Sequence, residues 1–220
     1  MFADLEIKWL GQSGFFIKSS SGKNIYIDPF RISKEFENEK ADFIFITHSH
    51  YDHCSIEDIQ KISRDGTVII CTADVPSKLR HINKKLDIRI TQIGADMELL
   101  KGELKFWTVV AYNLNKSAHT REEDWIGYLI KIDKTLIYHA GDTDFIPEMK
   151  RINGVDIALL PIGGTYTMNA GEAAKAVAVI KPKLAVPMHW GTIVGDRKDA
   201  EIFVKHCSTE GIDARILEKS

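Results

Sequence analysis

The chain has 220 residues, of which 44% are hydrophobic and 27% charged, and its 29 basic and 31 acidic side chains give a formal net charge of -2. These values are typical of a globular protein with one sizeable core, and they exclude a disordered chain and a basic nucleic-acid-binding protein. No apolar run approaches the roughly 20 residues of a spanning helix. We therefore expect one domain over residues 1–220, with no nucleic acid and no membrane insertion.

The cysteines and the first residues indicate the compartment. Cys54, Cys71 and Cys207 are too few and too scattered for a disulfide framework or a CxxC zinc site. The opening segment, MFADLEIKWLGQSG, lacks a basic stretch followed by a long apolar one, so no secretory signal is expected. We expect a reducing, cytoplasmic location. The sequence leaves the oligomeric state unknown.

Strands are predicted first along the chain. Apolar residues alternate with polar ones over 5–9, 15–17 and 25–27, and residues 43–46 form a continuous apolar run that is typical of a strand covered on both faces. Similar strand-like runs follow at 68–70, 104–110, 126–132, 135–139, 157–160 and 184–186. The early strands are expected to pair antiparallel, before a part of the chain in which strands and helices alternate.

Helical patterns lie between the strands. Residues 169–180 carry one apolar stripe at helical spacing, with Asn169 as the expected N-cap, Glu172 three residues later and Pro182 as the stop. Weaker helical patterns cover 56–62, 76–83, 146–152 and 199–207. The spacing of 157–160, 169–180 and 184–186 predicts a parallel crossover. The fold class is therefore α/β, with two mixed sheets and helices outside them.

The most informative segment follows the apolar run at 43–46. It carries His48, His50, Asp52 and His53 within six residues. Buried imidazoles and carboxylates each need a polar partner, and one divalent cation can serve several of them at once. Imidazole and carboxylate are the ligand set that zinc and similar metals prefer. The alternative, a solvent-exposed loop with chance histidines, requires an unusual coincidence.

The arrangement resembles the metallo-β-lactamase fold superfamily. His48-x-His50-x-Asp52-His53 after a hydrophobic strand is similar to its first metal motif, and two later segments are similar to its Gly-Asp and terminal histidine motifs: Tyr138-His-Ala-Gly-Asp-Thr-Asp144 and Pro187-Met-His189-Trp-Gly. Trp9-Leu-Gly-Gln-Ser-Gly14 and Tyr26-Ile-Asp-Pro29 resemble the branch that contains ascorbate-phosphate lactonase and the phospholipase D that releases N-acylethanolamines. The resemblance implies a four-layer αββα sandwich of two mixed sheets flanked by helices.

The resemblance also implies a set of metal ligands. His48 and His50 would bind one ion, Asp52, His53 and His189 the other, and Asp142 would bridge both. Asp142 follows a predicted strand and Gly141, where the chain has freedom to turn. The alternatives are a turn or capping role for Asp142, which Asp144 before Pro147 fits better, and a buried structural role for His189.

One position departs from the common pattern of the superfamily. Where many relatives carry a third histidine, this chain has Asn113, which is a poor zinc ligand. We favour His119, six residues later, as the replacement; otherwise it is an exposed loop histidine and the site lacks one ligand. His139, inside a predicted strand, is expected in the core or behind a ligand. His81 and His206 are expected on the surface.

Several neighbouring residues have two open interpretations. Asp28 either orients a ligating histidine or only ends a strand. Tyr166 lies in the loop 163–168, which is expected to overhang the strand ends, and is a substrate contact and catalytic residue or an ordinary loop tyrosine. Cys54 has no partner that would make it a nucleophile. Trp190, Tyr51 and Trp125 either form apolar walls of a substrate pocket or pack in the core.

These residues predict an enzyme, a metal-dependent hydrolase with two divalent ions. Two ions close together lower the pKa of a bound water to about 7, which makes hydroxide available to attack a carbonyl or phosphoryl centre. Asp52 is expected to accept a proton from that water, and Tyr166 or His119 to assist the leaving group. Zinc is the expected metal, with manganese or iron as alternatives. The expected substrate is a small molecule with an ester, lactone or phosphodiester bond.

Other functions on the same scaffold remain as alternatives. A di-iron redox protein is expected to carry a glutamate at the place of His50 and a separate flavin domain. A nuclease of the superfamily is expected to carry a large inserted domain. A non-catalytic metal-binding protein would bind metal without turnover. The sequence favours the hydrolase over all three.

Overall fold

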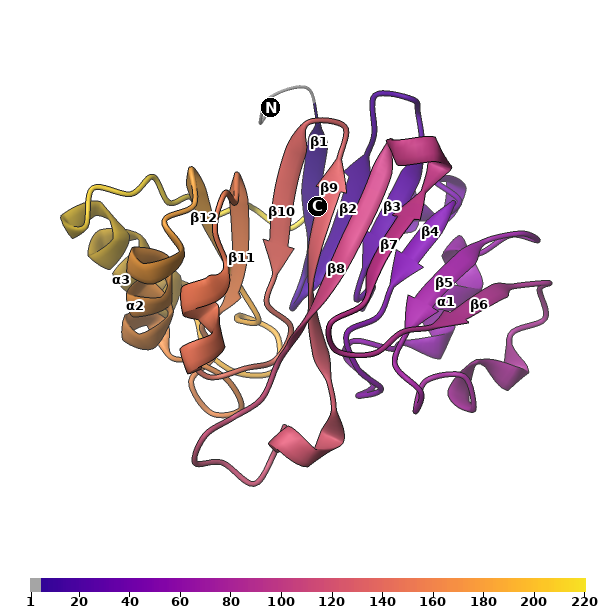
Figure 1. The fold of residues 1–220 in the computed structure, drawn as a ribbon. Coiled ribbons are helices and arrows are strands. Elements are labelled where there is room, and N and C mark those ends of the chain that lie inside the picture. Colours follow the sequence, from indigo (N-terminus) through magenta and orange to yellow (C-terminus); the bar gives the residue numbers. More distant parts are fainter. Residues whose placement is uncertain (1–4) are drawn as a thin grey trace. The chain divides into compact units, whose positions relative to one another are not determined.

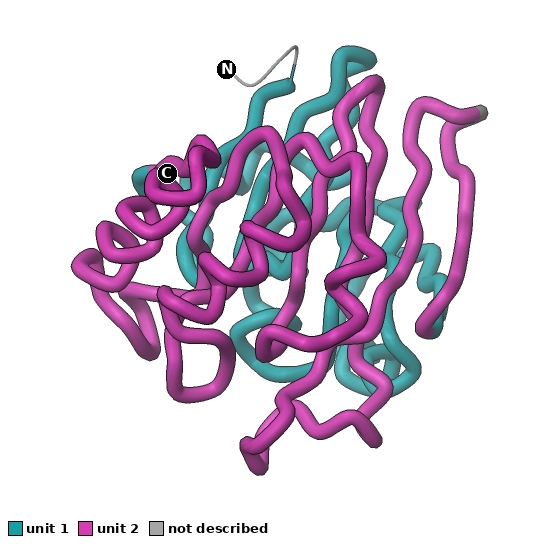
Figure 2. Tube along the Cα trace, turned by 60° about the vertical axis from the view of Figure 1, so that its left-hand side comes forward, with its two compact units in different colours: residues 1–92, 218–220 teal, residues 93–217 magenta. Residues whose placement is uncertain are grey.

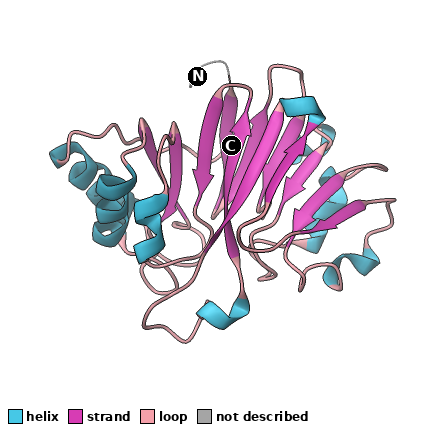
Figure 3. Cartoon of the chain, viewed as in Figure 1, coloured by secondary structure: helices cyan, strands magenta, loops and turns pink. Residues whose placement is uncertain are grey.

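The computed structural model describes residues 5–220, which form two compact units (Figure 2). The first unit contains the chain up to Gln92 together with Glu218–Ser220, and the second contains Ile93–Leu217. Each unit has its own six-stranded sheet and its own helices (Figure 1; Figure 3). The predicted pair of mixed sheets with helices is therefore confirmed, and the expectation of a single domain stays a prediction.

In the first unit the strands follow one another across the sheet in chain order. They are β1 (Glu6–Gly11), β2 (Gly14–Lys18), β3 (Asn24–Ile27), β4 (Phe43–Phe45), β5 (Val68–Cys71) and β6 (Asp87–Ile90). The pairs β1–β2 and β2–β3 are antiparallel, whereas the strands from β3 to β6 pair parallel. The carboxyl ends of β3 and β4 therefore lie at the same edge, which brings Asp28 to the start of the histidine-rich loop.

The core of the first unit is rich in aromatic and β-branched side chains. The ring of Phe16 packs 5.1 Å from that of Tyr26, whose hydroxyl donates a 2.6 Å hydrogen bond to the Glu39 carbonyl. Three short helices accompany the sheet: η1 (Lys34–Asn38) and η2 (Lys78–His81), both 3-10 helices, and α1 (Ile56–Ile62). The Ser55 hydroxyl caps α1 by accepting from the Asp58 amide at 3.3 Å, so this helix begins directly after the histidine-rich loop.

The sheet of the second unit has the strand order β12-β11-β10-β9-β8-β7. Its strands are β7 (Asp96–Leu99), β8 (Leu104–Val110), β9 (Ile126–Ile132), β10 (Thr135–His139), β11 (Ile157–Pro161) and β12 (Leu184–Met188). The strands β10, β11 and β12 pair parallel, and the others pair antiparallel. Asp142 and His189 follow the carboxyl ends of β10 and β12, and these ends therefore lie at one edge of the sheet.

The helices of the second unit are α2 (Ala170–Ile180), α3 (Arg197–Thr209), η4 (Arg121–Glu123) and two further 3-10 turns, η3 (Leu100–Gly102) and η5 (Pro147–Arg151). The predicted capping box is present at α2, because the Asn169 side chain accepts from the Glu172 amide and the Glu172 side chain from the Asn169 amide. α2 connects the parallel strands β11 and β12, as predicted. Among residues 5–220, the helices are all too short or too polar to cross a bilayer.

The structure corrects two helical segments and adds two strands. The segments 76–83 and 146–152, predicted as helices, are only 3-10 turns, η2 and η5, because runs this short support i to i+3 bonds better than a helical ladder. The prediction missed β6 and β7. Both are edge strands whose residues are mostly exposed or half-buried, so they lack the apolar pattern of a central strand.

Candidate metal centre

The loop that follows β4 carries the predicted ligands of the first unit. His48, Asp52 and His53 are buried, and His50 is half-buried. The amides of His53 and Cys54 both donate to the His50 carbonyl, at 3.1 and 2.8 Å, so the loop folds back on itself. This turn brings the carboxylate of Asp52 and the imidazole of His53 together, with Oδ2 of Asp52 3.6 Å from Nε2 of His53.

The polar atoms of this loop have the spacing of neighbouring metal ligands. Nε2 of His48 is 3.1 Å from Nδ1 of His50, and Nε2 of His53 is 3.6 Å from an oxygen of Asp52. Ligand atoms about 2.0–2.1 Å from a tetrahedral zinc ion stand about 3.4 Å apart. Imidazole and carboxylate donors at this spacing fit a divalent cation.

Asp28 supports the loop from the end of β3. One of its oxygens accepts from the Thr47 amide at 2.8 Å, and the other accepts from the Thr47 hydroxyl at 2.7 Å and lies 2.7 Å from Nδ1 of His53. Asp28 is in the left-handed backbone region, with a φ of 44°, which its short polar side chain tolerates. A carboxylate on Nδ1 directs Nε2 of His53 toward a metal. Of the two interpretations of Asp28, its contacts favour the orienting role.

Gln12, in the turn between β1 and β2, holds the side chain of Asp52, as Asp28 holds that of His53. The nitrogen of its side-chain amide donates to Oδ2 of Asp52 at 2.9 Å, and its backbone carbonyl accepts from the Trp9 indole at 2.9 Å. Gln12 is fully buried and has a φ of 50°. A left-handed backbone at a non-glycine residue and a buried polar side chain both lower the stability of the fold. The contact with Asp52 gives a reason for a glutamine at this position. The sequence indicated Gln12 only as part of the motif Trp9-Leu-Gly-Gln-Ser-Gly14 and predicted no role for it.

In the second unit, Asp142 lies between two histidines. Its Oδ2 is 3.2 Å from Nε2 of His119 and 3.0 Å from Nε2 of His189. All three side chains are buried. One carboxylate oxygen thus faces an imidazole nitrogen on either side, and carboxylate and imidazole are both donors suited to a divalent cation. The structure thus brings together the three predicted ligands of this unit.

The segment between β8 and β9 places His119, rather than Asn113, beside Asp142. The Asn113 amide nitrogen donates to the carbonyls of Ala118 and Tyr166, at 2.8 and 2.7 Å, so both of its hydrogens are used. The Asn113 backbone amide also donates to the His119 carbonyl at 2.7 Å. Asn113 therefore fastens the loop, and His119, with a φ of 58°, turns its ring toward the carboxylate.

His139 and Asp144, two further polar residues of this unit, have structural contacts. His139 is buried in β10 and accepts from the Gly141 amide at 3.3 Å, as expected for a residue behind the site. The capping role suggested for Asp144 is wrong: Ile146 precedes η5, and Pro147 begins it. Asp144 instead accepts from the Leu114 amide at 2.9 Å and pairs with Lys116, so its carboxylate holds the segment that leads to His119.

The aromatic residues expected near the site divide into two groups. Trp125 and Trp190 are buried; the ring of Trp125 packs 5.3 Å from that of His119, and the Trp190 indole donates to the Pro187 carbonyl at 3.1 Å. Tyr51 and Tyr166 are 64% and 43% exposed, respectively. Of these four aromatic residues, the two tyrosines are the ones accessible to a substrate.

The three cysteines are free and buried. Burial raises the pKa of the Cys54 thiol to about 12, which keeps it protonated at neutral pH. A protonated thiol is a poor nucleophile. The structure thus supports the expectation that Cys54, although adjacent to His53, takes no nucleophilic role.

Residues 6–189 match the family model described as a beta-lactamase superfamily domain. The chain belongs to this superfamily. A UPF0173 metal-dependent hydrolase of Archaeoglobus fulgidus is 31% identical over 97% of this chain and 95% of its own, and one of Thermococcus kodakarensis is 33% identical over 90% of each. The chain is thus a member of the UPF0173 metal-dependent hydrolases.

A similar solved structure supports the fold. A crystallised protein from Parabacteroides distasonis, assigned as a metal-dependent hydrolase, is 31% identical to this chain, covers 98% of it and is itself covered over 94%, with a TM-score of 0.85. This similarity confirms the metallo-β-lactamase fold of two six-stranded mixed sheets flanked by helices.

Proposed function

We propose that this UPF0173 member hydrolyses an ester-like bond of a small molecule, a lactone or a phosphodiester, at a dinuclear metal centre. The observation that carries the proposal is Asp142, whose Oδ2 lies within 3.2 Å of Nε2 of both His119 and His189. A carboxylate shared by two imidazoles is costly unless a cation or protons balance it. The imidazole nitrogens of His119 and His189, together with this carboxylate, are donors suited to a divalent cation.

The proposed ligand set follows the superfamily pattern. One ion would be held by His48, His50 and His119, with His119 in place of the absent third histidine; the other would be held by Asp52, His53 and His189, and Asp142 would contribute to both. The set contains only nitrogen and oxygen donors, so zinc is the expected metal and manganese or iron would also fit. We expect the protein to act in the cytoplasm, where its free cysteines would stay reduced.

The chain's own residues would position and protonate the reacting groups. The bound ions would supply Lewis acidity and hydroxide at neutral pH. Gln12 holds the Asp52 carboxylate, which is proposed to accept the proton of the attacking water. Asp28 holds the tautomer and orientation of His53. Tyr166, half exposed, or His119 would assist the leaving group.

The test combines metal analysis with a substrate panel. The purified protein should contain about two zinc, manganese or iron ions per chain, and it should hydrolyse at least one member of a panel of lactones and phosphodiesters. A chelator should abolish turnover, and the metal should restore it. Asp142→Ala should lose at least about 100-fold in kcat/KM with an unchanged circular dichroism spectrum.

Asp213→Ala provides the matched control, because that carboxylate forms an exposed ion pair with Arg215. It should retain full activity and metal content. Full activity of Asp142→Ala would contradict the proposal. Two ions without turnover on the whole panel would favour a non-hydrolytic metal-binding or redox protein instead.

A further inference from the structure

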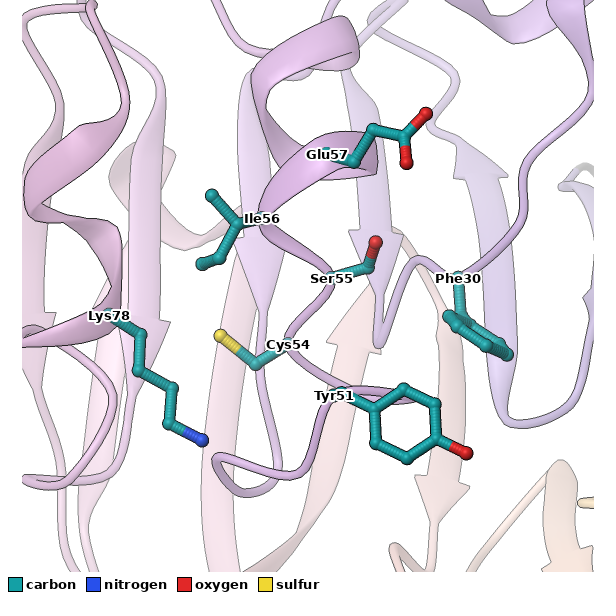
Figure 4. A pocket seen from close by; sticks show the side chains of 7 residues that line it. All are labelled: Phe30, Tyr51, Cys54, Ser55, Ile56, Glu57 and Lys78. Atoms are coloured by element: carbon teal, nitrogen blue, oxygen red, sulfur yellow. The ribbon is translucent and has the colours of Figure 1, made fainter.

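A hollow of about 540 Å³ opens beside the metal loop of the first unit (Figure 4). Its walls come from the loop after β3, the loop after β4, the start of α1 and η2. Its lining residues are Phe30, Tyr51, Cys54, Ser55, Ile56, Glu57 and Lys78. Tyr51 lies between His50 and Asp52 in the chain, and Cys54 follows His53. The hollow and the proposed ligands of this unit therefore share one turn.

One side of the hollow is aromatic. The rings of Phe30 and Tyr51 meet edge to face, with centroids 5.7 Å apart and planes at 77°. Phe30 is 6% exposed and has the Arg31 guanidinium 5.0 Å from its centroid on the ring face, whereas Tyr51 is 64% exposed. Phe30 is thus fixed by its packing, and Tyr51 presents an exposed aromatic surface that is not part of the core. Such a surface suits the apolar part of a ligand.

A cation lies on the other side. Lys78 extends from η2 into the hollow (Figure 4), where its ammonium donates to the Ser49 carbonyl. Within residues 5–220 it forms no ion pair, and an ammonium has three donors, so two remain for an anion. Glu57, the acidic residue of the lining, is paired with Lys61 at 2.8 Å. The hollow therefore carries an uncompensated positive charge opposite its aromatic wall.

We propose that this hollow binds the non-reacting part of the substrate, an apolar group that carries a carboxylate. The apolar group would lie against Phe30 and Tyr51, and the carboxylate would accept hydrogen bonds from Lys78. The substrate class is then a small ester or lactone with a carboxylate some atoms from the scissile bond. The inference rests on the proposed function, because the hollow is a substrate site only if the adjacent loop is catalytic.

A binding experiment tests the hollow without turnover. The metal-loaded protein is titrated with 3-phenylpropionate and with the neutral 3-phenylpropanol, and amide shifts are followed by NMR. Shifts should concentrate in residues 30, 51 and 54–57, and the acid should bind about fivefold more tightly, as a partly exposed charge-assisted bond gives. Lys78→Met should abolish this preference, and Lys78→Arg should keep it.

Lys84→Met, an exposed lysine of the same unit outside the hollow, is the control and should preserve the preference. Tyr51→Ala should weaken both ligands by about three- to tenfold, because it removes the aromatic wall for acid and alcohol alike. A preference that survives Lys78→Met would mean that the carboxylate binds the metal instead. That result, or shifts confined to other residues, would overturn the inference.

Turnover separates this inference from the proposed function. The kcat/KM of mono-4-nitrophenyl glutarate relative to 4-nitrophenyl acetate should fall about fivefold in Lys78→Met and stay unchanged in Lys84→Met. Hydrolysis of both esters with the same ratio in every variant would reject the hollow and keep the hydrolase. Failure to hydrolyse either ester would count against the hydrolase, and the NMR titration would still decide whether the hollow binds the carboxylate.

Discussion

The carboxylate of Asp28 lies 2.7 Å from Nδ1 of His53, although 25 residues separate them in the chain. Both side chains are fully buried. The parallel pairing of β3 and β4 makes this contact, because each residue follows the carboxyl end of one of these strands. The same carboxylate accepts hydrogen bonds from the amide and the hydroxyl of Thr47, so it holds three groups at the metal loop: these two and the His53 imidazole.

Replacing Asp28 should therefore weaken metal binding more than folding. Asp28→Asn keeps the shape of the side chain but removes its charge, and the partners behind ligating histidines typically contribute 10- to 100-fold in metal affinity. We expect a loss of about this size in a competition titration with a chromogenic chelator. Asp87→Asn, which alters an exposed ion pair with Arg89, should bind metal as the parent does. Equal affinities in the two variants would show that Asp28 does not orient a ligand.

His119 should be required for one of the two proposed ions. His119→Ala removes an imidazole that lies 3.2 Å from Asp142, so metal content should fall from about two ions per chain to about one. Asn113→Ala should keep both ions and bind them more weakly, because it only loosens the loop. His206→Ala, an exposed histidine of α3, serves as the control. Retention of both ions with parental affinity in His119→Ala would leave Asn113 or water as the third ligand.

Gly163 should tolerate no larger residue, because it packs against His189. A Cβ at this position would lie 2.5 Å from Cγ2 of Val194 and 2.7 Å from the His189 carbonyl oxygen. Gly163→Ala should displace His189 and lower metal affinity by about tenfold or more, measured by the same titration. Gly171→Ala, in α2, meets no atom closer than 3.4 Å and should be neutral or slightly stabilising. Unchanged metal affinity in Gly163→Ala would show that the backbone near His189 yields freely.

Stability should decline at alkaline pH partly through Cys207. Burial in α3 raises the pKa of its thiol from 9.0 to about 12. The folded state therefore keeps a proton that the unfolded chain releases above pH 9. The contribution of the protonated Cys207 thiol to the free energy of unfolding is complete below about pH 9 and is lost as the pH rises toward 12. Between pH 7 and pH 10 this thiol should cost about 1 kcal/mol of unfolding free energy.

The measurement is urea unfolding of the parent and of Cys207→Ala at both pH values. Other groups titrate in both proteins, so the difference between the two pH dependences isolates this thiol. The decline should be smaller in Cys207→Ala by about 1 kcal/mol. The same decline in both proteins would mean that the thiol ionises equally in the folded and unfolded states.

Local signals predicted the regular elements well. The capping box of Asn169 and Glu172 and the apolar stripe over residues 169–180 marked α2 to within one residue, because both signals act within a few turns of the chain. The continuous apolar runs likewise marked β4, β11 and β12. By contrast, β6 gains its strand conformation from pairing with β5 rather than from its own apolar pattern, and it was missed.

The predicted ligands fall into two groups, those that cluster in the sequence and those that are scattered along it. His48, His50, Asp52 and His53 lie within six residues, so their clustering is visible in the sequence. Asp142, His189 and His119 are scattered, and only the resemblance to the superfamily indicated them. Their approach within the second unit depends on where β10 and β12 end and on the loop that Asn113 fastens.

The sequence by itself determined the α/β class, the histidine-rich loop and the superfamily, because periodicity and motif spacing are properties of short stretches of chain. Only the tertiary structure decided which residues stand behind the ligands. Gln12 contacts Asp52 across 40 residues, and Asp28 contacts His53 across 25. Both contacts require β4 to pair with β3, a strand well separated from it in the chain, and no short stretch of sequence specifies which distant strands become neighbours. The hollow beside Lys78 likewise exists only because separate elements meet in the folded unit.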